Sequence, residues 1–278
     1  MNRIQALGIA AWAWRATGAV TLRPLLWLPF VFVAALQLGA LLLLVGFHRP
    51  LLLPLGLPLV DLLGGEPASH YPLLYYQLPA MFFKLNLVIS TLFASVAAGA
   101  GTLLFARSYG YPVEEGIWER TLRCAPRLIA VTLIVVACLL GVTLLASLVP
   151  REAAMESLLV RWGLRGALLG LFILLQSLLI YTTPWIVLLG HRIGPAIRDS
   201  VRVTLRTLFP TLIAVGIPLL LLFPFSYVTG RVDLLAGQLR PELIATLLGL
   251  QVVCQMLVTF FLIGGVTRLF LWRVEAAR

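Results

Sequence analysis

The segment that decides the fold is 243–271, which reads LIATLLGLQVVCQMLVTFFLIGGVTRLFL and has Arg268 as its single charged residue. A helix needs about 20 consecutive, mainly apolar residues to cross the hydrocarbon core of a bilayer. This run is longer than that, so a helix built from it would have to tilt or to extend past the membrane. We therefore predict a membrane-spanning helix here.

The rest of the chain has the same character. Of its 278 residues, 61% are hydrophobic and 12% are charged, whereas a soluble domain has roughly 45–50% apolar and about 25% charged residues. The sequence predicts an all-α membrane protein with about six transmembrane helices, in a single polytopic domain over 1–278. The other five spans are expected near 24–46, 79–106, 128–149, 164–189 and 210–228.

The arginines predict the orientation of these spans. If both termini are cytoplasmic, fourteen arginines lie in cytoplasmic segments and six on the opposite side. Cytoplasmic segments of membrane proteins are rich in Arg and Lys, so we expect a multi-pass protein of the cell (inner) membrane with both termini in the cytoplasm. The formal charge of +10 does not indicate a nucleic-acid partner, because the arginines are scattered between apolar runs.

A short pattern occurs three times. Thr-Leu-Arg stands at 21–23, 121–123 and 204–206, each shortly before a proline and before an odd-numbered span. The second and third copies continue into 126–131 and 210–215, which agree at five of six positions. Chance could produce such a tripeptide in an arginine-rich chain. The preferred interpretation is an internal repeat, with the spans arranged as three helical hairpins.

The segment 192–206 has the pattern of an amphipathic helix. Arginine recurs at every fourth position, and aliphatic residues recur in the same way on another face. Such a helix would lie flat on the cytoplasmic face of the membrane, with arginines among lipid phosphates. The segments 111–123 and 4–14 are similar. These helices either orient the bundle or bind anionic lipids or a partner protein, and the contact residues would be Arg23, Arg123, Arg198, Arg202 and Arg206.

Polar residues inside spans are costly in lipid and mark either interhelical hydrogen bonds or a functional path. We expect the amides of this chain to join helices. The alternative is a polar substrate path between spans 2, 4 and 6, formed by Asn86, Ser90, Gln176, Gln251 and Gln255. No acidic residue lies deep in any span, so the sequence does not support a proton relay through carboxylates.

Glycine and proline predict local departures from straight helices. The small residues of 94–101 and the pair Gly264-Gly265 would let helix backbones approach closely. Pro218 and Pro224 are expected to kink or break span five. The proline-rich run 51–63 is unsuited to a regular spanning helix and should lie at the membrane interface or dip into the bundle.

The sequence contains no recognisable catalytic constellation. Its three cysteines and three histidines form no CxxC or Cys/His cluster, and the histidines fall at the edges of spans. No GxSxG, HExxH or Walker motif occurs. We therefore expect no catalytic residue, metal or cofactor, and an enzymatic role has no positive support.

One region resembles a known family. Residues 184–200, PWIVLLGHRIGPAIRDS, lead into 201–213, VRVTLRTLFPTLI. A span that ends in Pro-x-Ile-Val, followed by Ala-Ile-x-x-Ser, a basic turn and the next span, resembles a prokaryotic six-helix group. That group includes the membrane domain of some glycerophosphodiester phosphodiesterases and stand-alone proteins of unknown function. The similarity covers mainly 80–270 and departs at 188–191, where Leu-Leu-Gly-His replaces an acidic end. It implies a fold and a membrane location.

Two functions follow as hypotheses. The first is a non-catalytic scaffold or accessory subunit that interacts with lipids, with other membrane proteins or with copies of itself. The second is a small transporter or lipid carrier with a polar site between spans 2, 4 and 6. The surface helices favour the first hypothesis, and the amides and prolines favour the second.

Overall fold

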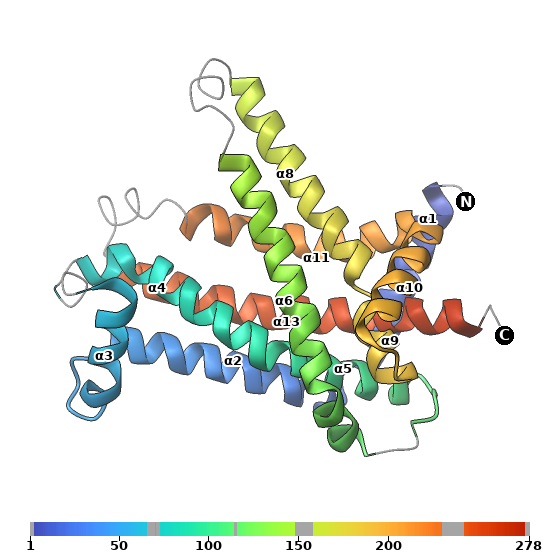
Figure 1. Ribbon diagram of the computed structural model, residues 1–278, viewed down its shortest axis with the longest axis horizontal. Coiled ribbons are helices and arrows are strands. Elements are labelled where there is room, and N and C mark those ends of the chain that lie inside the picture. Colours follow the sequence, from blue (N-terminus) through green and yellow to red (C-terminus); the bar gives the residue numbers. More distant parts are fainter. Residues whose placement is uncertain are drawn as a thin grey trace. The chain divides into compact units, whose positions relative to one another are not determined.

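The computed structural model describes residues 3–65, 70, 73–113, 116–147, 158–229 and 242–275, and these residues form helices and connecting turns without any strand. Six helical segments are long and apolar enough to cross a membrane, so the prediction of an all-α, multi-pass membrane protein is confirmed (Figure 1). The candidate spans are Pro24–Val45, Leu73–Ser108, Ile117–Leu144, Gly166–Leu189, Leu208–Thr229 and Glu242–Glu275.

The chain divides into two compact units. The first comprises Met1–Leu26, Ala98–Ile217 and Phe261–Arg278, and the second comprises Trp27–Ala97 and Pro218–Phe260. The helices α11 (Leu208–Thr229) and α13 (Glu242–Glu275) each contribute residues to both units.

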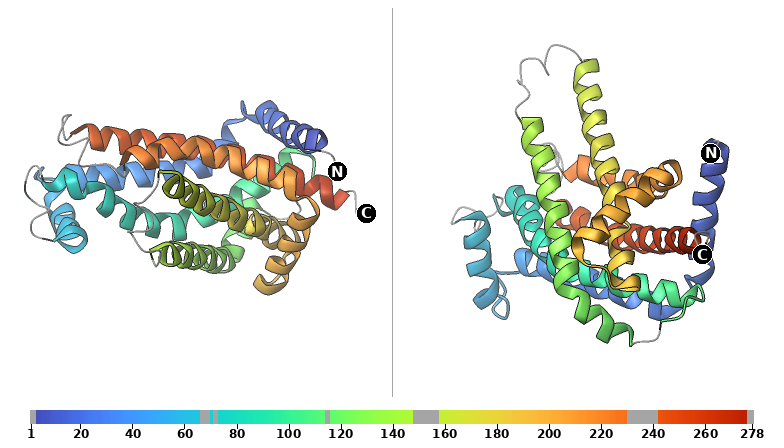
Figure 2. Two further views of the ribbon diagram at one scale, coloured as in Figure 1. Left: turned by 90° about the horizontal axis from the view of Figure 1, so that it is seen from above. Right: turned by 45° about the vertical axis from the view of Figure 1, so that its right-hand side comes forward.

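The second unit is built on long apolar helices that run side by side (Figures 1 and 2). These are α2 (Pro24–Val45), α4 (Leu73–Ile89) with its π-helical continuation η2 (Ser90–Ala94), and the first part of α13. Their contacting faces form one apolar core, in which Leu44, Leu78 and Ile244 are fully buried. Between membrane helices such contacts are stabilised by close van der Waals packing, because lipid tails are as apolar as the packed side chains.

A short helix, α3 (Leu53–Gly64), packs on the same unit. With 12 residues it is too short to cross a bilayer, as its prolines led us to expect. Pro54 is tolerated in the first turn, where its missing N–H has no helical acceptor. At the other end Lys84 Nζ donates to the Leu63 carbonyl over 2.7 Å, which supplies a donor for the helix C-terminus.

The first unit packs α1 (Arg3–Val20) against the second half of α13. The buried face of α1 consists of small residues, among them Ala13 and Thr17. A Cβ atom on Gly264 would collide with Thr17 Cγ2, and one on Gly265 would lie 3.1 Å from Trp14 Cδ1. The predicted glycine pair therefore permits a close helix contact, and the partner is α1.

Two expectations about local structure have different outcomes. α11 is continuous through Pro218 and Pro224, so the helix is not broken there, and a kink, the other predicted outcome, stays a prediction; proline is tolerated inside a membrane helix when neighbouring groups supply partners for the freed carbonyls. The three Thr-Leu-Arg copies lie in different local structures: a turn after α1, the first turns of α6 (Ile117–Ser147), and the end of α10 (Ile193–Arg206). The internal repeat stays a prediction.

The glycine contact gives a testable prediction. Gly264→Ala should lower the free energy of unfolding by about 1–3 kcal/mol, because the new methyl group overpacks the α1–α13 contact. The measurement is thermal unfolding in mild detergent, followed by tryptophan fluorescence. Gly18→Ala on α1 is the matched control, since its Cβ would meet no atom within 4 Å. Equal melting temperatures for the two variants would contradict the packing account.

Candidate functional site

The fourth span is interrupted, and the interruption organises the first unit. α8 (Leu158–Leu179) ends, and after a short turn α9 (Thr182–Leu189) begins. Pro184 lacks an N–H and so cannot donate to the carbonyl of residue 180. A helix end inside a bundle leaves carbonyl groups without helical donors, and such groups must find partners when hydrocarbon surrounds the protein.

The amphipathic helix α10 supplies donors for the end of α8. Ser200 Oγ donates to the Leu178 carbonyl over 2.7 Å, and Thr204 Oγ1 donates to the Ser177 carbonyl over 2.9 Å. Ala196, Ser200 and Thr204 lie on one helix face, at every fourth position, and are fully buried. α10 is thus fixed to the bundle by a face of small residues that hydrogen-bond to α8.

α6 supplies donors for the end of α9. Arg120 donates from Nε to the Val187 carbonyl over 2.6 Å and from Nη2 to the Leu188 carbonyl over 2.8 Å. Gly190, with φ of 72°, closes the helix in the left-handed conformation that glycine adopts at helix ends. A guanidinium group can serve two carbonyls at once because its N–H groups are held in one plane. Arg120 was absent from the predicted site residues.

The opposite face of α10 is exposed and basic. The side chains of Arg198 and Arg202 are 72% and 60% exposed, and each has a nitrogen 3.7 Å from Asp199 Oδ1. Arg206 is exposed as well. His191 stacks on Trp185, with ring centroids 4.8 Å apart, and its Nδ1 lies 3.6 Å from Asp199 Oδ2. We call Arg198, Arg202 and Arg206 the α10 arginine face.

The remaining predicted contact residues are exposed. Arg23 lies in the turn between α1 and α2. Arg123 pairs with Glu119 one helical turn earlier, over 3.1 Å, with both side chains more than half exposed. Such surface pairs contribute little to stability, so both arginines are accessible to solvent or to lipid headgroups.

A second polar junction joins α1, the end of α5 (Ser95–Ser108) and α13 in the same unit. Tyr109 donates its hydroxyl to the Gly264 carbonyl over 3.2 Å and lies 3.1 Å from Thr17 Oγ1. Burial raises the pKa of Tyr109 to about 12, so the phenol stays protonated and remains a donor. Arg268 places its guanidinium carbon 4.5 Å from the Trp12 ring centroid and 5.4 Å from that of Tyr109.

The second unit contains a buried amide cluster. Gln37 Nε2 donates to Asn86 Oδ1 over 2.6 Å, and Ser90 Oγ donates to the same oxygen over 3.4 Å. Gln37 is 3% exposed. The structure therefore brings Asn86 and Ser90 together, and it adds Gln37, which the sequence analysis did not select. The sequence alone could have pointed to Gln37, because it is the only residue with an amide side chain in its span.

Two other residues of the predicted path, Gln251 and Gln255, also lie in the second unit. Gln255 lines a small cavity with Gln37 and Thr259, and the Gln251 side-chain oxygen is buried without a hydrogen-bond partner among the described residues. The cavity volume is about 40 Å³, enough for about one ordered water. Gln176 is half-buried and belongs to the first unit, whereas the other four residues of the predicted path belong to the second.

Within the described ranges, no group of three or more His, Cys, Asp or Glu side chains could hold a metal ion.

The partly buried Arg120 gives a prediction with a control on the same helix. Arg120→Gln should lower the free energy of unfolding by about 1–3 kcal/mol, because carbonyls at the end of α9 lose their donors. Arg123→Gln removes a pair between two exposed side chains and should change the melting temperature little. Thermal unfolding of both variants in the same detergent checks this, and an equal effect of the two substitutions would exclude Arg120 as the anchor of α9.

The amide pair gives a second prediction, best measured as a double-mutant cycle. Gln37→Leu and Asn86→Leu should each destabilise the protein, since the first removes the shorter hydrogen bond to Asn86 Oδ1 and the second leaves the buried Gln37 amide without this acceptor. The double variant should cost less than the sum of the two, with a coupling of about 1 kcal/mol. Additive losses in melting temperature would show that the two amides do not depend on each other.

Comparisons of the chain with protein-family models, with curated proteins and with solved structures give no match. The resemblance of 184–213 to the six-helix group therefore stays a prediction, and the function has to be argued from the chain's own residues.

Proposed function

We propose that this protein is a non-catalytic membrane scaffold or accessory subunit that binds anionic lipids through the α10 arginine face. The observation that supports this most directly is the way α10 is held. Its buried face donates two hydrogen bonds to α8, and its arginines are exposed on the other side. A helix fixed in this way presents its cations in a constant arrangement.

The charge of this surface favours an anionic partner. The three arginines of the face are balanced by a single carboxylate, Asp199, on the same helix. Each basic residue close to an anionic bilayer contributes about 1 kcal/mol of attraction. Lipid phosphates are the nearest anions for a helix attached to a six-span bundle, and the charge-assisted hydrogen bonds that a guanidinium donates to them are strong.

Orientation and repeat belong to the same proposal. Placing the arginine-rich segments on the cytoplasmic side of the inner membrane puts α10 against a leaflet that is rich in anionic lipids. Both termini are then cytoplasmic. Three hairpins related by the Thr-Leu-Arg repeat would place an arginine near this surface at the entry to each odd-numbered span.

The carrier hypothesis is supported by one observation, the cavity beside Gln37 and Gln255. Its volume of about 40 Å³ is far below the roughly 300–1,000 Å³ of ordinary small-molecule sites. Gln37 and Asn86 also satisfy each other, as amides that join helices do. These features favour the scaffold, in which the amides hold the bundle together.

The proposal is tested by lipid-dependent stabilisation. Added phosphatidylglycerol should raise the melting temperature of the delipidated protein more than phosphatidylcholine does, since a ligand that binds only the folded state stabilises it. Arg198→Gln, Arg202→Gln and Arg206→Gln should each weaken the apparent affinity for phosphatidylglycerol about fivefold, the equivalent of about 1 kcal/mol per arginine.

The control is Arg49→Gln, an exposed arginine in the turn after α2, which should leave the phosphatidylglycerol response unchanged. High salt should reduce the response of the unsubstituted protein, because exposed charges are screened. Equal responses to the two lipids, or a loss with Arg49→Gln as large as with Arg202→Gln, would refute lipid binding at the α10 arginine face.

A further inference from the structure

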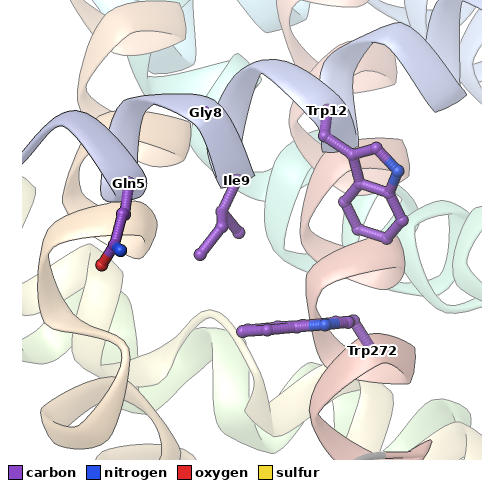
Figure 3. A pocket seen from close by; sticks show the side chains of 5 residues that line it. All are labelled: Gln5, Gly8, Ile9, Trp12 and Trp272. Carbon is purple, nitrogen blue, oxygen red and sulfur yellow. The ribbon is translucent and has the colours of Figure 1, made fainter. Parts of the chain in front are cut away.

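A groove runs between α1 and the end of α13 in the first unit (Figure 3). Gln5, Gly8, Ile9 and Trp12 line it from α1, and Trp272 lines it from α13. On α1 these positions follow the helical spacing of three and four residues, so they lie on one face. The groove has a volume of about 470 Å³, within the range of about 300–1,000 Å³ typical of ligand sites.

The absence of a side chain at Gly8 leaves space in the groove. A Cβ atom on Gly8 would meet no atom within 4 Å, so the space above this residue is empty of protein. In Figure 3 the Trp272 ring lies across from Ile9 and Trp12, and the space between α13 and α1 is flanked by these side chains. Gln5 is the single polar side chain among the lining residues. An occupant is therefore apolar along most of its length.

A cationic side chain contacts one of the groove-lining residues. Arg268 lies one helical turn before Trp272 on α13, and its guanidinium stacks on Trp12, which lines the groove. Its Nε is buried without a hydrogen-bond partner among the described residues. α1 carries arginines and no carboxylate. The complementary ligand combines an apolar chain with an anionic group.

We propose that this groove binds one acyl chain of an anionic phospholipid, with the phosphate beside Arg268. The two indoles suit this position, since tryptophan is enriched where headgroups meet acyl chains. α13 is itself a candidate span, so bilayer lipid has direct access to the groove. The inference rests on the proposed lipid-binding function but concerns a different surface, formed by α1 and α13 instead of α10.

The experiment uses the full chain in nanodiscs that contain phosphatidylglycerol with a photoactivatable diazirine on one acyl chain. After illumination, mass spectrometry should find the label concentrated on peptides that contain residues 5–12 and Trp272. Gly8→Leu fills the groove and should abolish this labelling. The matched control is Gly18→Leu on the same helix, where a Cβ also meets open space outside the groove, and its labelling should equal that of the unsubstituted protein.

Three results would overturn the inference. They are unchanged labelling in Gly8→Leu, equal labelling by a diazirine phosphatidylcholine, and labelling spread evenly over the lipid-exposed helices instead of concentrated on residues 5–12 and Trp272. If Gly8→Leu fails to fold, Ile9→Trp fills the same groove and is judged by the same labelling.

The outcome is separable from that of the proposed function. Replacing the α10 arginine face by glutamine should leave the groove labelling intact, whereas Gly8→Leu should leave the effect of those substitutions on lipid-dependent stabilisation intact. If only the groove labelling is absent, the groove fails to bind lipid. If only the effect of the arginine substitutions on lipid-dependent stabilisation is absent, the α10 arginine face fails to bind lipid.

Discussion

The structure of the first unit depends on one constraint: a backbone carbonyl released inside a membrane protein must find a donor within the protein. The end of α8, at its break from α9, and the end of α9 at Gly190 each release such carbonyls. Side chains from two other helices meet this requirement, Ser200 and Thr204 for α8 and Arg120 for α9. These two helix ends are therefore where α10 and α6 are attached.

This constraint explains why two arginines close together on one helix have different roles. Arg120 and Arg123 are three positions apart on α6, yet the first donates to two carbonyls of α9 and the second pairs with Glu119 at the surface. α10 likewise divides its polar residues, with hydroxyl groups turned toward the bundle and guanidinium groups turned away. The donors that face the bundle support the fold, and the α10 arginine face remains exposed on the surface.

Length and hydropathy were enough to predict the six spans, because the thickness of the bilayer sets a single requirement that every span must meet. The Gly264-Gly265 contact was also predictable, since only small residues allow such an approach. The hydrogen-bond partners of polar side chains were harder to predict from the sequence. The aliphatic periodicity of 192–206 predicts a face turned to lipid, which agrees with Leu205 being 64% exposed, but it does not indicate that Ala196, Ser200 and Thr204 form the face that is buried in the protein.

The reason is physical. Hydropathy patterns describe transfer from water to lipid, whereas Ser200, Arg120 and Gln37 are positioned by particular acceptors that lie at least 22 residues away in sequence. A one-dimensional pattern contains no information about which carbonyl a break will release or where it will lie. The predicted path residues show the same limit: Asn86 and Ser90 meet, but their partner Gln37 comes from another span.

The anchoring of α10 to α8 is tested most directly by hydrogen–deuterium exchange of the backbone amides of 196–206 in nanodiscs. The account predicts slow exchange, similar to that of the neighbouring spans, in the unsubstituted protein. It also predicts much faster exchange after Ser200→Ala and Thr204→Val, which remove the donors and keep every charge. Fast exchange in the unsubstituted protein would mean that α10 is loosely attached, and slow exchange that persists in the double variant would mean that other contacts hold it; either result would contradict the account.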